Sequence, residues 1–158
     1  MPYDVDIKHV PDQQVASVRV RTTLATIGAA IGDGFAVLMG ALTDAATQPT
    51  GAPFVIYHDV IDGQTEGDIE ICIPVSAGTA ASHPEVEVRA ISGCTVAATT
   101  HRGPYDEISP AYDTVTRWIQ DHGHQVAGPP RELYLNDPQD VLPEEVLTKV
   151  QFPIDDPA

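Results

Sequence analysis

Apolar residues recur at three- and four-residue steps in two stretches of the chain, which is the spacing of one face of an α-helix. The second stretch has clear boundaries, because Ser109 suits an N-cap, Pro110 suits the first helical position and Gly123 suits the stop. The apolar positions are Ile27, Ala30, Ile31, Phe35, Leu38 and Leu42 in the first stretch and Ile108, Ala111, Tyr112, Val115, Trp118 and Ile119 in the second. We therefore predict two helices.

Short runs with alternating or continuous apolar character surround both helices and predict β-strands. The predicted strands cover residues 3–9, 13–21, 54–59, 68–74, 85–90, 95–101, 131–136 and 146–153. Each half of the chain then reads strand, strand, helix, strand, strand.

The two halves also resemble each other in residue detail, in the same order along the chain. The matching pairs are Val15-Ala16 with Val96-Ala97, Arg21 with Arg102, Ile27 with Ile108, Gly51–Tyr57 with Gly128–Tyr134, and Ile69–Val75 with Leu147–Ile154. We predict one α+β domain over residues 1–158, made of two repeats at about 1–77 and about 84–156. The repeats should form a pseudo-two-fold antiparallel sheet with both helices on one face and the second face free to line a ligand cleft.

The charge balance limits the partners of this domain. Eight basic residues against 23 acidic ones give a formal net charge of -15, which repels phosphate backbones and anionic lipids and attracts cations. No apolar run approaches the roughly 20 residues of a membrane helix, and no secretory signal is present at the N-terminus. The six histidines lack metal-ligand spacing. We expect a cytoplasmic protein without metal, cofactor, membrane or direct nucleic-acid binding.

One strand carries an unusual charge, in the segment G-P-P-R-E-L-Y-L-N-D-P. Alternation places Glu132 and Tyr134 on one face of this strand, while the equivalent of Glu132 in the first repeat is the apolar Val55. Such asymmetry is expected of a binding site built on a symmetric scaffold, since a partly buried carboxylate can accept an organic cation. The alternatives are an ion pair with Arg102 or Arg131 and simple exposure to water.

Aromatic residues extend this candidate site. Tyr57 and Tyr134 are equivalent in the two repeats, and aromatic faces attract organic cations. Tyr105 and Trp118 add to the set in the second half. Core packing is the alternative for each tyrosine, and it is the favoured role of Tyr112 and Trp118, which lie on the helical apolar stripe.

Four segments of the second half resemble the GyrI-like small-molecule-binding family, the effector-binding domain of AraC-type and MerR-type regulators. They are H-R-G-P-Y-D-E-I, W-I-Q-D-H-G, G-P-P-R-E-L-Y-L-N-D-P and P-E-E-V-L-T-K-V-Q-F-P-I. The resemblance implies a duplicated α+β domain whose cleft takes hydrophobic, often cationic molecules, with a glutamate at the position of Glu132 meeting the positive charge. The regulators also carry a helix-turn-helix domain, whereas this sequence begins almost directly with the first repeat, so we expect a stand-alone ligand-binding chain.

Three functions follow as hypotheses. The leading one is binding of amphipathic, cationic small molecules, with ligand contacts from Glu132, Tyr134, Tyr57, Tyr105, Trp118 and Val55. The second is hydrolysis of strained electrophiles such as cyclopropanes or epoxides, because some stand-alone members of the family look like hydrolases. There Glu132 would activate water, and Tyr134 or Tyr57 would donate a hydrogen bond. The third is a protein-interaction role like that of a gyrase inhibitor.

Overall fold

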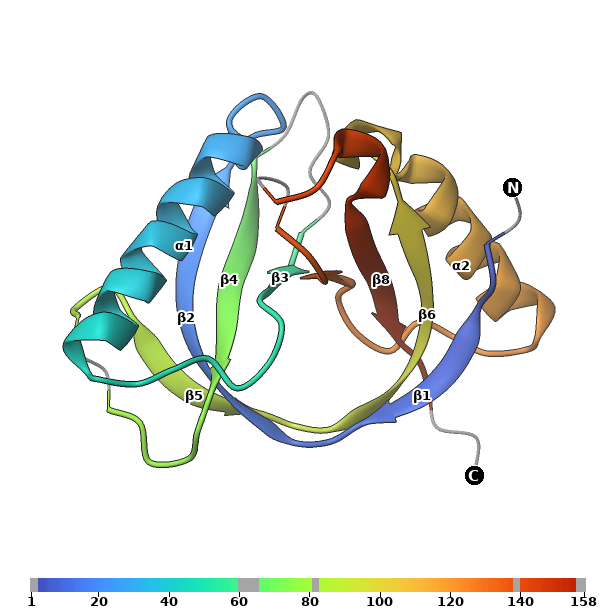
Figure 1. Cartoon of the computed structure of the whole chain (residues 1–158). Coiled ribbons are helices and arrows are strands. Elements are labelled where there is room, and N and C mark those ends of the chain that lie inside the picture. Colours follow the sequence, from blue (N-terminus) through green and yellow to red (C-terminus); the bar gives the residue numbers. More distant parts are fainter. Residues whose placement is uncertain (1–2, 60–65, 81–82, 138–139, 156–158) are drawn as a thin grey trace. The chain divides into compact units, whose positions relative to one another are not determined.

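The computed structural model describes residues 3–59, 66–80, 83–137 and 140–155. It divides into two compact units: unit 1 combines Met1–Pro11 with Gly93–Ala158, and unit 2 is Asp12–Ser92. Within the described residues, each unit is an antiparallel sheet with one α-helix (Figure 1). The predicted α+β class is therefore confirmed.

Unit 1 has the strand order β1-β6-β8-β7. Its helix α2 follows β6 along the chain and is connected to β7, with two short 3-10 helices, η1 and η2, in the loops. The elements are β1 Asp6–Val10, β6 Cys94–Arg102, η1 Tyr105–Glu107, α2 Ser109–Asp121, β7 Arg131–Tyr134, η2 Pro143–Glu145 and β8 Leu147–Pro153.

Unit 2 has the strand order β5-β2-β4-β3, which matches unit 1 strand for strand. Its helix α1 follows β2 and leads to β3, as α2 follows β6 and leads to β7. The elements are β2 Gln13–Thr22, α1 Ile27–Asp44, β3 Phe54–Tyr57, β4 Gly67–Val75 and β5 Glu87–Ile91. The common order agrees with a duplication, which stays a prediction from the sequence.

The outer strand of each unit comes from the other half of the sequence. β1 pairs with β6, and β5 pairs with β2, both antiparallel. The compact units therefore do not coincide with the repeats expected at 1–77 and 84–156. The period-2 pattern predicted both strands, but it carries no information about which strand each one pairs with.

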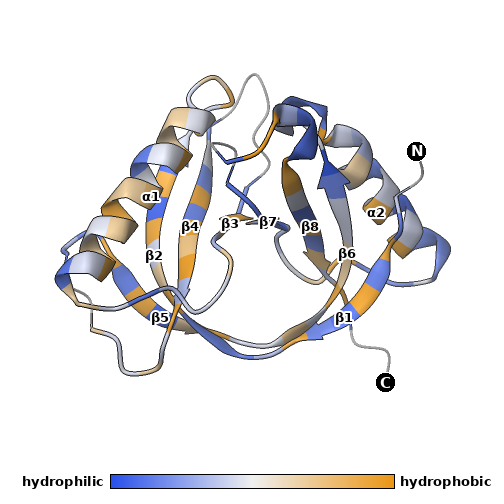
Figure 2. Ribbon diagram, viewed as in Figure 1, coloured by the Kyte–Doolittle hydropathy of each residue, from blue (hydrophilic) through white to orange (hydrophobic). Residues whose placement is uncertain are grey.

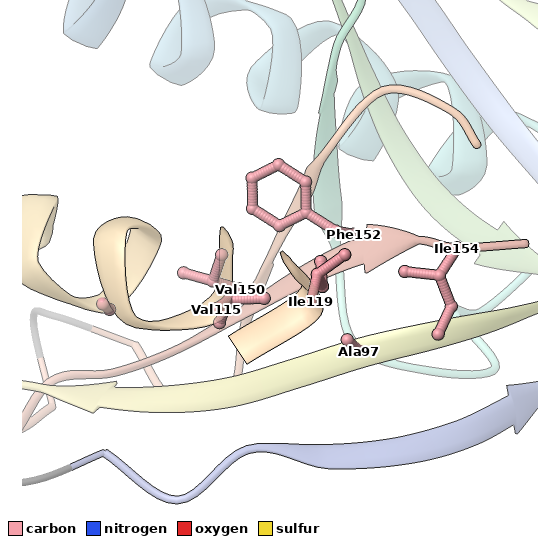
Figure 3. Packing of buried hydrophobic residues seen from close by; sticks show 7 residues of the cluster. Ala97, Val115, Ile119, Val150, Phe152 and Ile154 are labelled. Atoms are coloured by element: carbon pink, nitrogen blue, oxygen red, sulfur yellow. The ribbon is translucent and has the colours of Figure 1, made fainter. Parts of the chain in front are cut away.

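The core of unit 1 lies between α2 and its sheet. Ala111, Val115 and Ile119 of α2 belong to one buried cluster with Val150 and Phe152 of β8. Figure 3 shows Val115 and Ile119 beside these two strand residues. The three helix residues lie on one face of α2, as the sequence pattern predicted.

The ends of α2 confirm part of the sequence prediction. Pro110 lies in the first turn, and Gly123 adopts the positive φ of 75° that ends many helices. The helix begins at Ser109 itself, however, and the N-cap residue is Ile108, which has no side-chain cap. The prediction of Ser109 as N-cap is therefore wrong by one residue.

Helix α1 packs closely on its sheet through a glycine. A Cβ atom on Gly34 would lie 2.2 Å from Cδ1 of the buried Ile71, so a larger residue there would require the Ile71 side chain or the helix to move. Figure 2 shows apolar positions along α1 and along β2 and β4. By length and composition alone α1 could cross a membrane, contrary to the expectation from the sequence, but its buried residues Leu38, Ala41 and Leu42 lie in the core of the folded domain.

Unit 2 also contains a buried ion-pair cluster that the sequence analysis did not find. The side chain of Glu70 is 3% exposed and accepts hydrogen bonds from Arg89 Nε at 2.8 Å, Arg89 Nη2 at 2.6 Å and His58 Nε2 at 2.9 Å. Burial raises the pKa of Glu70, but hydrogen bonds from Arg89, His58 and Ser17 outweigh it and bring the pKa to about 2. Glu70 is therefore held as a carboxylate.

Candidate functional site

Glu132 lies on the face of the unit 1 sheet that α2 covers. It is directly opposite Val150 in the register of β7 and β8, and Val150 belongs to the core under α2. Because residues opposite each other on neighbouring strands share a face, Glu132 and Tyr134 both point to the helix side. The predicted alternation is confirmed, but this is the helix-covered face and not the free face that we expected to line a cleft.

Two phenols hold the Glu132 carboxylate. The hydroxyl of Tyr112, on the first turns of α2, donates a hydrogen bond to Oε2, and the hydroxyl of Tyr134 lies 3.3 Å from Oε1. Glu132 is only 9% exposed. Both phenols are uncharged hydrogen-bond donors, so the site places a nearly buried carboxyl group among aromatic side chains.

Tyr112 is the site residue that the sequence analysis assigned to the core. It does pack there, with its ring edge-on to Phe152 at a centroid distance of 5.8 Å. A buried tyrosine nevertheless needs a partner for its hydroxyl, and an ionisable residue on a facing strand is a natural one. The need for a hydroxyl partner could have indicated Tyr112 as a site residue, but sequence periodicity alone does not show that α2 faces β7.

Tyr105 extends the aromatic surface from η1. Its ring meets that of Tyr134 edge-on, with centroids 5.7 Å apart, and it remains 40% exposed. Partial burial, and after it the negative charges of Glu132 and Asp137, raise the pKa of Tyr105. Two tyrosines thus bond to the carboxylate and a third packs on one of them. Tyr105 and Tyr134 were predicted as site residues, and Tyr112 was not.

The two arginines considered as ion-pair partners of Glu132 project from the other face of the sheet. Arg131 is next to Glu132 on β7, so alternation directs its side chain away from α2, where Nη2 lies 3.8 Å from Cys94 Sγ. Arg102 is opposite Leu147, which also belongs to that other face. Neither arginine shares the helix-covered face with Glu132.

Trp118 lies farther along α2 than Tyr112. The two residues are six positions apart in the helix, which corresponds to about 9 Å along the axis. The Trp118 ring stacks on His122 at a centroid distance of 4.0 Å and is parallel to His124 at 6.1 Å. The structure therefore does not bring it to the phenols around Glu132, and its role at a ligand stays a prediction.

Val55 and Tyr57 belong to β3 of unit 2. They are opposite Ile71 and Ile69 of β4, on the face that α1 covers, and Val55 is fully buried. Their predicted ligand contacts stay predictions. In the part of the chain that the structure describes, no three His, Cys, Asp or Glu side chains come together in a way that could hold a metal ion.

Solved structures with the same fold cover almost the whole chain. The C-terminal domain of EcmrR aligns with 99% of this chain and 100% of its own length, at 24% identity and a TM-score of 0.82. In the EcmrR–DNA complex the alignment has a TM-score of 0.84 and 24% identity and covers 98% of this chain, which spans only 58% of that longer chain.

Two more distant structures share the fold. A hydrolase from Listeria innocua aligns with 96% of this chain and 91% of its own at 12% identity, with a TM-score of 0.66. The structure of SAV2435 bound to tetraphenylphosphonium aligns with 98% of this chain and 94% of its own at 14% identity, with a TM-score of 0.64. The comparison with curated proteins found no match.

The family comparison covers nearly the same span as the structural ones. The model of the GyrI-like small molecule binding domain matches residues 3–155, which include both units and the Glu132 site. The chain belongs to the GyrI-like family of small-molecule-binding domains.

Proposed function

We propose that this domain binds amphipathic organic cations at Glu132. The observation that carries the proposal is a carboxylate that is 9% exposed and held by the hydroxyls of Tyr112 and Tyr134. Removing an ionised carboxylate from water is costly unless it is paired or hydrogen-bonded. An organic cation offers such pairing with less competition from water than a surface carboxylate would face.

The surrounding side chains suit the apolar part of such a ligand. Tyr105 and Tyr134 supply aromatic surface next to the carboxylate, and ring faces attract cations by about 0.5–2 kcal/mol each. Burial is the main cause of the raised pKa of Tyr105, and the negative charge of Glu132 contributes to it, as expected of a ring close to that carboxylate. The net charge of -15 adds a weaker, long-range attraction for cations.

Tetraphenylphosphonium is a suitable first probe, since the protein SAV2435, of the same fold, has been solved bound to it. Tetraphenylborate is its matched control, because the two ions share shape and hydrophobicity and differ in the sign of the charge. We expect tetraphenylphosphonium at a hundredfold excess over its Kd to raise the Tm by about 5–10 °C, and tetraphenylborate to have little effect.

The same melting experiment in about 1 M NaCl removes the long-range contribution, because the Debye length falls to about 3 Å. The cation preference should persist there if it arises at a nearly buried carboxylate. Equal shifts from both ions, or none from either, would contradict the proposal.

A second candidate is hydrolysis of strained electrophiles by the same residues. The favouring observation is the contact between Tyr112 and Glu132, which pairs a proton donor with a carboxylate that could activate water. If the domain is such an enzyme, incubation with an aryl epoxide should yield the diol faster than buffer alone, as measured by chromatography. A diol yield equal to that of Glu132→Gln would exclude this activity for the compound tested.

A further inference from the structure

The helix-covered faces of the two units differ at a small set of positions. In unit 1, Tyr134, Thr148 and His101 form a row across β7, β8 and β6, whereas the same row of unit 2 starts from Tyr57 and is otherwise aliphatic. At four positions unit 1 has a polar residue where unit 2 has an aliphatic one. Named with unit 1 first, the pairs are Thr99 and Val18, His101 and Val20, Glu132 and Val55, and Thr148 and Ile69.

All four polar side chains are nearly buried, with exposed fractions of 9% or less. Burying a polar group costs free energy unless it forms a hydrogen bond. The aliphatic residues at the same positions of unit 2 avoid this cost. The polar residues of unit 1 therefore need either an internal partner or an external one.

Three of the four have internal partners. Thr99 Oγ1 donates to the carbonyl of Asp4 at 2.6 Å. His101 Nε2 is 3.0 Å from the carbonyl of Pro104, which can only accept, so Nε2 donates and Nδ1 accepts from Tyr3 at 2.9 Å. Glu132 accepts from tyrosines, as described above.

Thr148 is the exception. It is fully buried, and its hydroxyl has no hydrogen-bond partner among the residues that the structure describes. Its two neighbours in the row direct their polar atoms elsewhere, His101 to Tyr3 and Pro104 and Tyr134 to Glu132. The hydroxyl is thus left for a group that the described residues do not supply.

We propose that Thr148 is a second anchor for the ligand of unit 1, whose hydroxyl forms a hydrogen bond with a polar group carried beside the ligand's positive charge. The inference rests on the proposed function, since it takes Glu132 as the charge anchor. Thr148 is a diagonal neighbour of Glu132 across β7 and β8, at a typical separation of about 7 Å. The ligand class is therefore an amphipathic cation with a hydroxyl or amino group a few ångströms from the cationic centre.

The ligand can reach this hydroxyl by displacing an aromatic ring. Tyr134 is the row neighbour of Thr148 and is only half-buried, resting against the exposed Tyr105. A ligand that takes the place of the Tyr134 ring meets Glu132 and Thr148 together.

Matched probes and variants test the proposal. The probes are tetraphenylphosphonium, which has no hydrogen-bonding group, and its three isomers with one hydroxyl on one ring, each measured by calorimetric titration. At least one isomer should bind the wild-type domain about three- to tenfold more tightly than the parent ion. The Thr148→Val variant should bind this isomer and the parent ion with equal affinity. The Thr148→Ser variant should still bind the isomer more tightly than the parent ion.

Thr99→Val is the control, because it removes a buried hydroxyl on the same face that already has a partner. It should keep the preference for the hydroxylated isomer and lower the Tm by about 2–4 °C. Thr148→Val, which removes a hydroxyl without a partner, should leave the Tm unchanged or up to about 3 °C higher. A Thr148→Val variant that melts as low as Thr99→Val would overturn the proposal, since its hydroxyl would then have a partner within the fold.

Different results would contradict the proposed function and the Thr148 anchor. If the wild-type domain binds none of the four cations, the proposed function fails and the Thr148 anchor falls with it. If the parent ion binds but no isomer gains affinity, or if Thr148→Val keeps the gain, Thr148 is not an anchor while the proposed function stands.

Discussion

Replacing Glu132 by glutamine should weaken the binding of tetraphenylphosphonium by about 10- to 100-fold. Glutamine has the size of glutamate. Its single carbonyl oxygen can accept a hydrogen bond from one of the two phenols, and its amide nitrogen can donate to the oxygen of the other, so the substitution removes the charge and keeps hydrogen-bonding groups in place. Interactions with a charged group are worth about 1.5–3 kcal/mol, which corresponds to this range of affinity. Calorimetric titration of the variant and the wild-type domain measures the change directly.

Glu144→Gln is the matched control for this experiment. Glu144 is an exposed residue of unit 1, in η2, and its substitution changes the net charge by the same one unit. We expect its Kd to stay within twofold of the wild-type value, because a single exposed charge contributes little in physiological salt. Equal losses in both variants would mean that the cation responds only to the overall field of the protein and that Glu132 is not its partner.

Local patterns in the sequence predicted all eight strands and both α-helices that the structure describes, with the ends shifted by a few residues. Periods of 2 and 3.6 depend only on which face each residue buries, and these faces are the same whether or not the partner element is known. The pairing partners of the outer strands could not be predicted from the sequence. β1 pairs with β6 and β5 pairs with β2, and a local pattern does not specify which strands pair.

The candidate site was predictable in its centre and not in its surroundings. Glu132 and Tyr134 stood out because their alternation placed a charge beside a shared tyrosine, and both lie where that alternation puts them. Tyr112 and Thr148 did not stand out, since a tyrosine on an apolar helix stripe and a threonine in a strand are ordinary core residues. Their importance depends on α2 and β8 lying next to β7, which is a property of the tertiary structure.

The Glu70 cluster shows the same limit in unit 2. A glutamate between isoleucines in I-E-I-C-I is visible in the sequence as a charge within an apolar strand. Its partners His58 and Arg89 come from other strands or their ends, 12 and 19 residues away, and no local pattern connects them. Substitution of Glu70 in this cluster nevertheless has the largest effect on stability that we expect in this protein.

Glu70→Gln should lower the free energy of unfolding by about 3 kcal/mol at neutral pH, as measured by urea denaturation. The variant places a neutral amide at the nearly buried position 70, opposite the Arg89 guanidinium, whose side chain is 34% exposed, and removing the charge of one partner of a buried pair is strongly destabilising. Glu66→Gln is the control, since Glu66 bonds to Arg21 at 3.1 Å with both side chains more than half exposed, and surface pairs of this kind contribute at most about 1 kcal/mol.

The pH dependence of this difference identifies its origin. The folded-state pKa of Glu70, about 2, lies below the ordinary value of 4.5, so its contribution is complete above pH 4.5 and is lost as the pH falls towards 2. A shift of this size corresponds to about 3 kcal/mol. Protonated glutamate resembles glutamine, so the two unfolding curves should converge as the pH approaches 2. A difference that persists undiminished at pH 2 would show that Glu70 acts through packing and not through its charge.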